Sequence, residues 1–260
     1  MKLLTWNILA SEWIKKSYYP TVKEKVLFDR KSRLKRIMER IIDEDPDILL
    51  LQEVMELEYK TFMKHLQTKY HISFLSPINW AKEKATKTEE NKNIEERKKE
   101  ITSESGNVTL LKKTIFKSKK DIHHETLPMD FGLYTTTFYQ SRQIHIFNIH
   151  LNDLHAQRRN TQMNVLRPFV EKQKYCIIAG DFNQEYRHNS KLYNITNFTV
   201  HNVCPTYYIE KNMNIDNILT KGFSIKDTDT DTCNYVPLKV ENGFKIYGSD
   251  HLPVTLLVKV

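Results

Sequence analysis

Cysteine is scarce in this sequence: three residues, Cys176, Cys204 and Cys233, are spread over 260 positions. An odd number without a Cys-x-x-Cys pair argues against a disulfide-rich scaffold and against a structural zinc site. Long apolar runs are also missing, and none approaches the roughly 18 residues that a membrane-spanning helix needs. The opening segment, Met1–Asn7, turns polar too soon for a secretory signal. We therefore expect a soluble, intracellular protein of the cytoplasm or nucleus.

Internal repeats and linkers rich in Pro, Gly or Ser are absent as well, and a length of 260 residues suits one large domain or two small ones. Hydrophobic residues make up 40% and aromatic residues 11%, which is enough for a packed core and excludes general disorder. The composition shifts only at 81–104, where Lys, Glu, Thr and Asn dominate. This stretch is predicted to be a charged insertion, either a loop or an exposed helix.

Positive charge is in excess, with 40 Lys and Arg against 32 Asp and Glu and a formal net charge of +8. Such a balance favours polyanionic partners, because Lys and Arg release counterions when they meet phosphates. Charge alone does not separate nucleic-acid binding from simple solubility. We expect no membrane partner and no obligate protein partner.

Hydrophobic periodicity predicts helices at 29–44, 57–68 and 155–166, the last ended or kinked by Pro168. Apolar runs between turn residues predict strands. The expected strands are 2–9, 47–53, 71–75, 107–111, 132–139, 143–149, 175–179, 215–219 and 252–258. Strands without regular βαβ alternation, accompanied by a few helices, predict an α+β fold with two packed sheets.

Polar residues cluster where these strands begin or end. Each one alone is most often a cap or a solvated tip. Six such positions with related chemistry are harder to explain in that way. They are Asn7, Glu53, His150, Asp181 with Asn183, Asp216, and the run Ser249-Asp250-His251.

Hydrolysis of a phosphodiester needs the residue types found in this set. Glu53 and Asn7 offer oxygen ligands suited to Mg2+, for which Mn2+ could substitute. Asp181 can orient or deprotonate a water. Donors to the phosphate are expected from Asn183 and His150, and from His251 when a carboxylate such as Asp216 orients it.

In order along the chain, six motifs resemble those of the endonuclease/exonuclease/phosphatase (DNase I-like) superfamily. They are Leu-Leu-Thr-Trp-Asn-Ile-Leu-Ala, Leu-Leu-Leu-Gln-Glu-Val, Ile-His-Leu, Ala-Gly-Asp-Phe-Asn, Ile-Asp-Asn-Ile and Gly-Ser-Asp-His-Leu-Pro. The resemblance implies a four-layered α/β/β/α sandwich with mostly antiparallel sheets, in which residues 1–260 form a single catalytic domain.

The resemblance also implies a role for each residue. Asn7 and Glu53 would hold the metal, with Asp250 near it. His150 and Asn183 would contact the scissile phosphate, Asp181 would act on the nucleophile, and Asp216 would pair with His251. Asn107 matches a position on a strand that approaches the site. It could be a site residue or a structural strand cap.

The sequence shares features with two branches of the superfamily. The opening Asn-Ile-Leu-Ala, Tyr18-Tyr19-Pro20 and Arg33 are similar to the deadenylase, nocturnin and 2′-phosphodiesterase branch. Arg158, Arg159 and Gln162 are more similar to the 5′-tyrosyl-DNA phosphodiesterase branch. Asn152-Asp153 after His-Leu and Met213-Asn214 before Ile-Asp depart from the usual pattern, which puts the substrate in doubt rather than the reaction type.

The resemblance therefore implies a Mg2+-dependent nuclease, a 3′-exonuclease on RNA or oligoadenylate. Its expected partner is nucleic acid, single-stranded RNA or an oligonucleotide in particular. The alternatives are a 5′-tyrosyl-DNA end-repair phosphodiesterase and a phosphatase on a soluble nucleotide or inositol phosphate. A binding module without catalysis is a further alternative, although Glu53, Asp181 and His251 are all retained.

Aromatic residues in loops beside the predicted site have two interpretations. They could stack on single-stranded bases, or they could pack against the edge of the sandwich. The residues are Trp13, Tyr18, Tyr19, Trp80 and Tyr186.

Overall fold

The computed structural model describes residues 1–74, 105–187, 190, 192–201, 204–209, 212–227 and 239–259. The predicted charged insertion at 81–104 and Trp80 lie outside the described residues.

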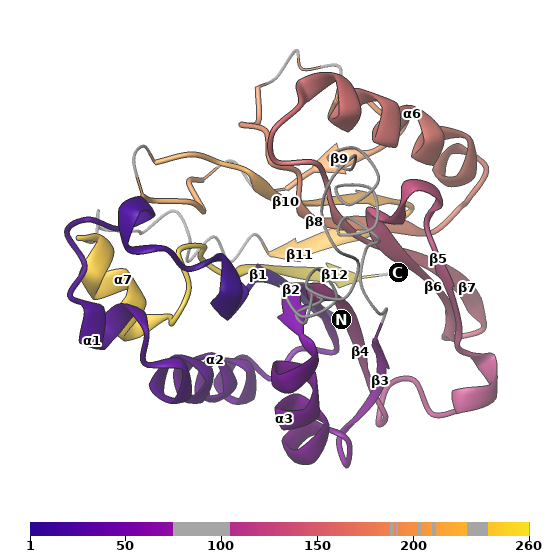
Figure 1. Ribbon diagram of the computed structural model, residues 1–260. Helices are drawn as coiled ribbons and strands as arrows, with labels where there is room; N and C mark the ends of the chain where they lie inside the picture. The colour runs from indigo at the N-terminus through magenta and orange to yellow at the C-terminus, as the bar shows by residue number, and fades with distance from the viewer. Residues whose placement is uncertain are drawn as a thin grey trace, which may run out of the picture.

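The described residues form two six-stranded sheets (Figure 1). The strand order in the first sheet is β11-β12-β1-β2-β4-β3, and in the second it is β5-β6-β7-β8-β10-β9. The strands of the first sheet, in chain order, are β1 Lys2–Asn7, β2 Ile48–Met55, β3 Tyr70–Phe74, β4 Ser105–Lys112, β11 Ser224–Asp227 and β12 Val254–Lys259. Those of the second are β5 His123–Thr126, β6 Gly132–Tyr139, β7 Arg142–His150, β8 Cys176–Asp181, β9 Thr199–Val200 and β10 Asp216–Lys221.

Helices cover the outer faces of both sheets (Figure 1). α2 and α3 lie against the first sheet and α6 lies against the second, which confirms the predicted four-layered sandwich. The helices are α1 Glu24–Leu27, α2 Arg30–Glu44, α3 Glu56–Leu66, α6 Ala156–Glu171 and α7 Val240–Ile246, with short 3-10 turns at Ser11–Trp13, Lys16–Tyr18, Lys119–Asp121 and Pro128–Asp130. None of the described helices has the length and apolarity that crossing a membrane requires.

The central strands are apolar on both faces because each sheet is covered on both sides. In β2, Ile48 and Leu50 join the core between the two sheets, whereas Leu49 and Leu51 pack toward α2 and α3. β8 follows the same alternation on the other sheet, with Ile178 packed toward α6. This burial on both sides explains why the sequence of β2 begins with four consecutive aliphatic residues.

Each sheet contains one parallel pair, β1 with β2 and β7 with β8. Parallel neighbours need a crossover connection, which α2 provides in the first sheet and α6 in the second. The carboxyl ends of the two strands in each pair therefore lie at the same edge. Antiparallel partners begin at that edge, as when Asp216 at the start of β10 stands opposite Asp181 at the end of β8. This topology gathers the polar strand ends at one edge of the sandwich.

The expectation that helix α6 ends at Pro168 is wrong. The helix continues to Glu171 because Leu166 and Val170 are buried in the core on either side of the proline. Pro168 itself and Asn164, whose carbonyl loses its helical hydrogen bond, both lie on the exposed face. Water can satisfy that carbonyl, so the lost bond costs little here.

The cysteines give a mixed result. Cys176 is a buried free thiol in β8, and burial raises its pKa, as suits a small core residue. Cys204 is disulfide-bonded, so the odd cysteine count did not exclude a single bridge.

Candidate active site

Asn7, at the end of β1, links two carboxylates. Its Nδ2 atom donates to Oε1 of Glu53 and to Oδ2 of Asp181, each at 2.9 Å. Its own Oδ1 accepts from the backbone N–H of Leu9 at 3.0 Å, which fixes the orientation of the amide. Asn7 is 1% exposed. Residues 46 and 174 positions away in the sequence therefore meet at one buried amide group.

Glu53 is aimed at this point by an irregularity in β2. The pairing between β2 and β4 shifts register between Leu51 and Val54, and Glu53 has a φ of 56°, in the left-handed region. A non-glycine residue is strained there, and such bulges re-aim side chains beside sites. The second carboxylate oxygen, Oε2, accepts from the backbone N–H of Ala10 at 2.9 Å.

Asp181 is positioned by a close approach of two strands. The preceding Gly180 has a φ of 143°, and a Cβ atom added there would lie 1.9 Å from the carbonyl oxygen of Ile149 in β7. Only glycine fits at this position without displacing a strand. After Asp181, the backbone N–H of Asn183 donates to its Oδ1 at 2.7 Å. Both oxygens of the carboxylate are thereby held in place.

Neighbouring groups shift the pKa of Asp181 in opposite directions. Burial and the charge of Asp216 raise its pKa to about 6, while His251, His150 and the Asn7 hydrogen bond act in the opposite direction. The Nε2 atoms of His150 and His251 each lie 3.8 Å from Oδ2 of Asp181. His150 also lies 3.9 Å from Oε1 of Glu53. Two imidazoles therefore face one buried carboxylate.

His251 pairs with Asp216, as the sequence led us to expect. Nδ1 of His251 lies 2.8 Å from Oδ2 of Asp216. Burial by itself lowers the pKa of His251, but the charges of Asp216 and Asp250 outweigh it and hold the pKa well above the usual range. The pairing therefore favours a protonated imidazole whose Nε2 points toward Asp181.

Asp250 is the fourth carboxylate of the group and is 3% exposed. Its Oδ2 accepts from the hydroxyl of Tyr19 at 3.0 Å. Burial raises the pKa of Asp250, and the nearby charge of Glu53 adds to the increase. Tyr19 is itself 3% exposed, which favours packing over base stacking for this aromatic residue, whereas Trp13 and Tyr18 are 51% and 56% exposed.

Asn183 and Asn107 also have defined partners. The side-chain Nδ2 of Asn183 donates to the carbonyl of Leu151 at 2.9 Å, so one of its two N–H groups remains for another acceptor. Asn107 lies between the sheets, where its Nδ2 donates to the carbonyl of Asn148 at 2.8 Å. Asn148 in turn accepts from Gln52, the neighbour of Glu53, at 2.8 Å. This arrangement favours the structural interpretation of Asn107.

Arg33 connects the two chain segments that carry the site, a role that sequence reasoning did not assign. The side chain is 3% exposed on α2. Its Nη2 donates to the carbonyls of Ile8 and Leu9 at 3.1 and 2.7 Å, and its Nε donates to Gly248 at 2.6 Å. The sequence does contain a sign of this role, because Arg33 directly precedes Leu34 at the apolar face of the predicted helix. A charged residue there needs buried acceptors.

The four carboxylates fit a hard divalent cation. Three of them, Asp181, Asp216 and Asp250, are at most 3% exposed, and burial near like charges raises the pKa of Asp181 and Asp250. Oxygen ligands of this kind suit Mg2+ or Mn2+. Asp181, Asp216 and His251 present ligand atoms within 4.8 Å of one another. However, the charges of Asp216 and Asp250 favour the protonated form of His251, and an imidazole must lose that proton before it can bind a metal.

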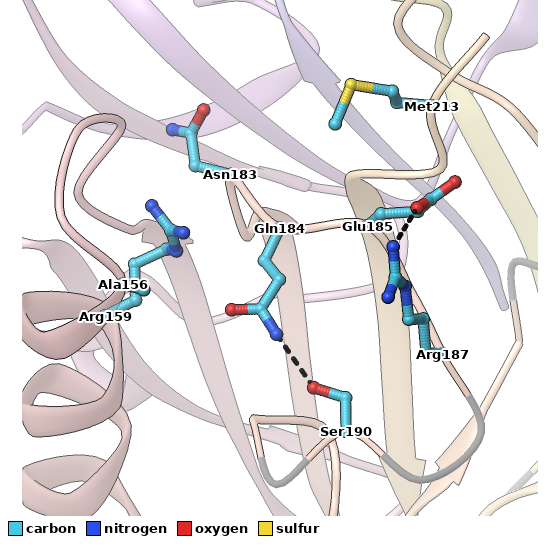
Figure 2. Close-up of a pocket in the computed structure, with 8 residues that line it drawn as sticks. All are labelled: Ala156, Arg159, Asn183, Gln184, Glu185, Arg187, Ser190 and Met213. Carbon is cyan, nitrogen blue, oxygen red and sulfur yellow. Dashed lines mark hydrogen bonds and ion pairs between the residues drawn. The ribbon is translucent and has the colours of Figure 1, made fainter. Parts of the chain in front are cut away.

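A cavity of about 600 Å3 opens beside this group (Figure 2). Asn183 lies on its wall next to Arg159 of α6, and Arg187 and Met213 line the opposite side. Sequence reasoning named Arg159 and Met213 only as features of the family pattern. It did not identify Arg187, because nothing local links these segments.

The comparisons with solved structures agree on the fold. The human Nocturnin catalytic domain with bound sulfate is 18% identical with a TM-score of 0.63, covering 100% of this chain and 94% of that chain. ANGEL2, a 2′,3′-cyclic phosphatase, is 16% identical with a TM-score of 0.68, covering 98% and 93%. D. rerio TDP2 complexed with a single strand DNA product is 12% identical with a TM-score of 0.61, covering 100% and 99%.

No curated protein matches this sequence significantly. The model of the endonuclease/exonuclease/phosphatase family matches residues 4–251. This range contains each of the carboxylates and histidines of the group described above. The chain therefore belongs to the endonuclease/exonuclease/phosphatase family.

Proposed function

We propose that this protein is a Mg2+-dependent phosphodiesterase that acts on nucleic acid, as a 3′-exonuclease on single-stranded RNA or oligoadenylate. The observation that carries the proposal is the Asn7 amide, which holds Glu53 and Asp181 together while two imidazoles face Asp181 at 3.8 Å. Carboxylates and imidazole donors gathered at one site are the groups that in-line hydrolysis of a phosphodiester requires. The net charge of +8 supports a polyanionic substrate.

Asp181 is the residue best placed to act on the nucleophile. It orients a water and takes its proton as the water oxygen attacks phosphorus, and the bond to the leaving oxygen breaks on the opposite side. The protonated His251 donates to the charge that develops on the phosphate, and Asp216 keeps its ring in position. His150 and the remaining N–H of Asn183 are further donors to the phosphate oxygens.

Glu53, with Asn7 and Asp250 beside it, would hold the divalent cation. When bound, the cation neutralises phosphate charge and stabilises the leaving oxygen. In the structure, the Asn7 nitrogen faces the two carboxylates, so this residue also keeps Glu53 and Asp181 at a fixed separation. The hydroxyl of Tyr19 donates to Asp250 and orients its carboxylate.

The test is hydrolysis of a labelled oligoadenylate with Mg2+ and with EDTA. We expect stepwise release of mononucleotides that requires Mg2+ and falls by on the order of 10²–10³ in Asp181→Asn. Glu53→Gln should fall similarly, whereas Glu39→Gln, on the exposed face of α2, is the matched control. Turnover by Glu53→Gln at the wild-type rate, or full activity in EDTA, would contradict the proposal.

A second candidate substrate is a 5′-tyrosyl-DNA end. One observation favours it: Arg159 and Gln162 brace the segment after His150, where Nη1 of Arg159 donates to the carbonyl of Asn152 at 2.9 Å and Gln162 accepts from its N–H at 3.0 Å. These are residues that resemble the tyrosyl-DNA branch. A panel of oligoadenylate, 2′,5′-linked oligoadenylate, abasic duplex DNA, 5′-tyrosyl DNA and an inositol phosphate separates the candidates. Preference for the tyrosyl adduct by tenfold or more would replace the RNA assignment.

A further inference from the structure

The cavity beside the carboxylates carries an inference about the substrate. Its volume of about 600 Å3 lies within the range of roughly 300–1,000 Å3 that small-molecule sites occupy. Asn183 joins it to the candidate active site, because Asn183 lines the cavity while its backbone N–H donates to Asp181. A group bound in the cavity would therefore be a direct neighbour of the reacting phosphate.

Arg159 provides a half-buried guanidinium on one side of the cavity (Figure 2). Its Nη1 is fixed by the carbonyls of Asn152 and Asp153 at 2.9 and 3.2 Å. Its Nε is buried and has no hydrogen-bond partner among the residues that the structure describes. An unsatisfied buried N–H of a guanidinium is costly unless a ligand accepts from it.

Arg187 provides a second guanidinium on the other side, beside Glu185 (Figure 2). Its Nη2 lies 3.2 Å from Oε2 of Glu185, and its side chain is 79% exposed. An exposed ion pair of this kind contributes little, so a phosphate can displace the carboxylate at low cost. Two guanidiniums in one cavity favour phosphate, whose oxygens match the planar fork of arginine.

The wall between the two arginines is held by hydrogen bonds within the protein. Tyr193 donates from its hydroxyl to the carbonyl of Gln184 at 2.6 Å, and the Gln184 amide donates to Ser190 at 2.9 Å. The backbone N–H of Tyr186 donates to the carbonyl of Asn214 at 2.8 Å, which brings Met213 to the opposite side. The thioether of Met213 and the Gln184 amide offer one apolar and one polar surface, as a nucleobase requires.

We propose that this cavity, the Arg159–Arg187 pocket, binds the nucleotide next to the scissile bond and holds its second phosphate on the guanidiniums. The inference rests on the proposed phosphodiesterase function and narrows it. A pocket that receives one nucleotide requires an unstacked base, so the preferred substrates are single-stranded ends that carry a phosphate flanking the reacting one. Duplex interiors and diesters without a flanking phosphate are poorer substrates.

The probe is adenosine 3′,5′-bisphosphate, compared with adenosine 3′-monophosphate and adenosine 5′-monophosphate by calorimetry in Mg2+. None of the three contains a phosphodiester, so binding is measured apart from the proposed reaction. The bisphosphate should bind about tenfold more tightly than the better monophosphate, since a charge-assisted contact is worth roughly that ratio. The ratio of the dissociation constants for the monophosphate and the bisphosphate is measured for each variant separately, so a general loss of affinity cancels.

Arg187→Gln is the decisive variant because the side chain is exposed and pairs only with Glu185 among the described residues. Arg159→Gln is the second, with circular dichroism as a check because Arg159 also braces the segment at Asn152. Arg167→Gln, on the same helix but away from the pocket, is the charge-matched control.

The proposal is supported if either pocket variant lowers the ratio at least threefold while Arg167→Gln keeps it. It is overturned if the wild type shows no gain for the bisphosphate, if both pocket variants keep the gain, or if Arg167→Gln loses it equally. If the wild type does not hydrolyse oligoadenylate but still binds the bisphosphate more tightly through the arginines, the proposed function is wrong and the pocket stands. If the wild type hydrolyses oligoadenylate but shows no tighter binding of the bisphosphate, the function stands and the pocket proposal is wrong.

Discussion

Glu53 and Asp181 are joined through a single nitrogen, because each accepts a 2.9 Å hydrogen bond from Nδ2 of Asn7. The two carboxylates belong to different sheets of the sandwich, Glu53 to β2 and Asp181 to β8. Their separation is therefore set by one side chain between the sheets. A site divided between two sheets depends on such a link, since small shifts of one sheet would otherwise misplace the acids.

Asn7→Ala should reduce turnover by about 10–100-fold, the usual effect of removing a partner that orients a metal ligand. The substitution leaves two neighbouring carboxylates without their shared donor. Steady-state kinetics on oligoadenylate measures the effect, with Asn164→Ala on the exposed face of α6 as the matched control. Wild-type kinetics in Asn7→Ala would show that the link has no catalytic importance.

Mg2+ should raise the melting temperature of the wild type. A cation that binds only the folded state adds stability by mass action, about 2.7 kcal/mol at a hundredfold excess over its dissociation constant. It also relieves the repulsion between carboxylates that adds to burial in raising the pKa of Asp181 and Asp250. Differential scanning fluorimetry in EDTA and in Mg2+ measures the difference. The increase should vanish in Glu53→Gln and persist in Glu39→Gln, and an equal increase in both would place the cation elsewhere.

Arg33→Met should destabilise the fold by about 3 kcal/mol or more, because buried carbonyls lose a charged donor. The carbonyls are those of Ile8, Leu9 and Gly248, on the two segments that carry Asn7 and His251. Urea unfolding measures the loss. Lys35→Met removes a charge from the same helix at a position that is 75% exposed, and it should change stability little. Equal stability of the two variants would refute the bracing role of Arg33.

Acid should weaken the fold through His201. Burial lowers the pKa of His201 to about 4, below the ordinary value of 6.5, and its Nε2 lies 2.6 Å from the hydroxyl of Thr220. The unfolded chain therefore takes up the proton first, and this contribution to stability is lost as the pH falls from about 6.5 to about 4. Above pH 6.5 the residue is neutral in both states and contributes no pH dependence.

His201→Gln should therefore reduce the slope of the stability profile between pH 6.5 and pH 4, as measured by urea unfolding at several pH values. Part of the slope should remain, because burial also lowers the pKa of His124 to about 4. His65→Gln, which removes an exposed imidazole on α3, should follow the wild type. A profile for His201→Gln that runs parallel to the wild type across this window would show that the imidazole titrates alike in both states.

The sequence determined the main elements and their chemistry. α2 begins and ends close to the predicted limits because its signals are local: Asp29 accepts from the N–H of Ser32 at 3.0 Å as the N-cap, and Asp45 ends the helix with a φ of 46°. The central strands are apolar on both faces, so each one can be recognised as a hydrophobic stretch in the sequence. β5, β9 and β11 were not predicted, since short edge strands have no such pattern.

Only the tertiary structure decided which groups touch. Polar residues at strand ends indicated a site, but they did not reveal that Asn7 would hold two carboxylates or that Arg33 would brace both segments behind it. The pocket walls come from α6, the segment after β8 and the segment before β10, and no local pattern connects Arg159, Arg187 and Met213. Residue types and local periodicity are properties of neighbouring positions. Distances between side chains depend on how two sheets pack, which the whole chain sets together.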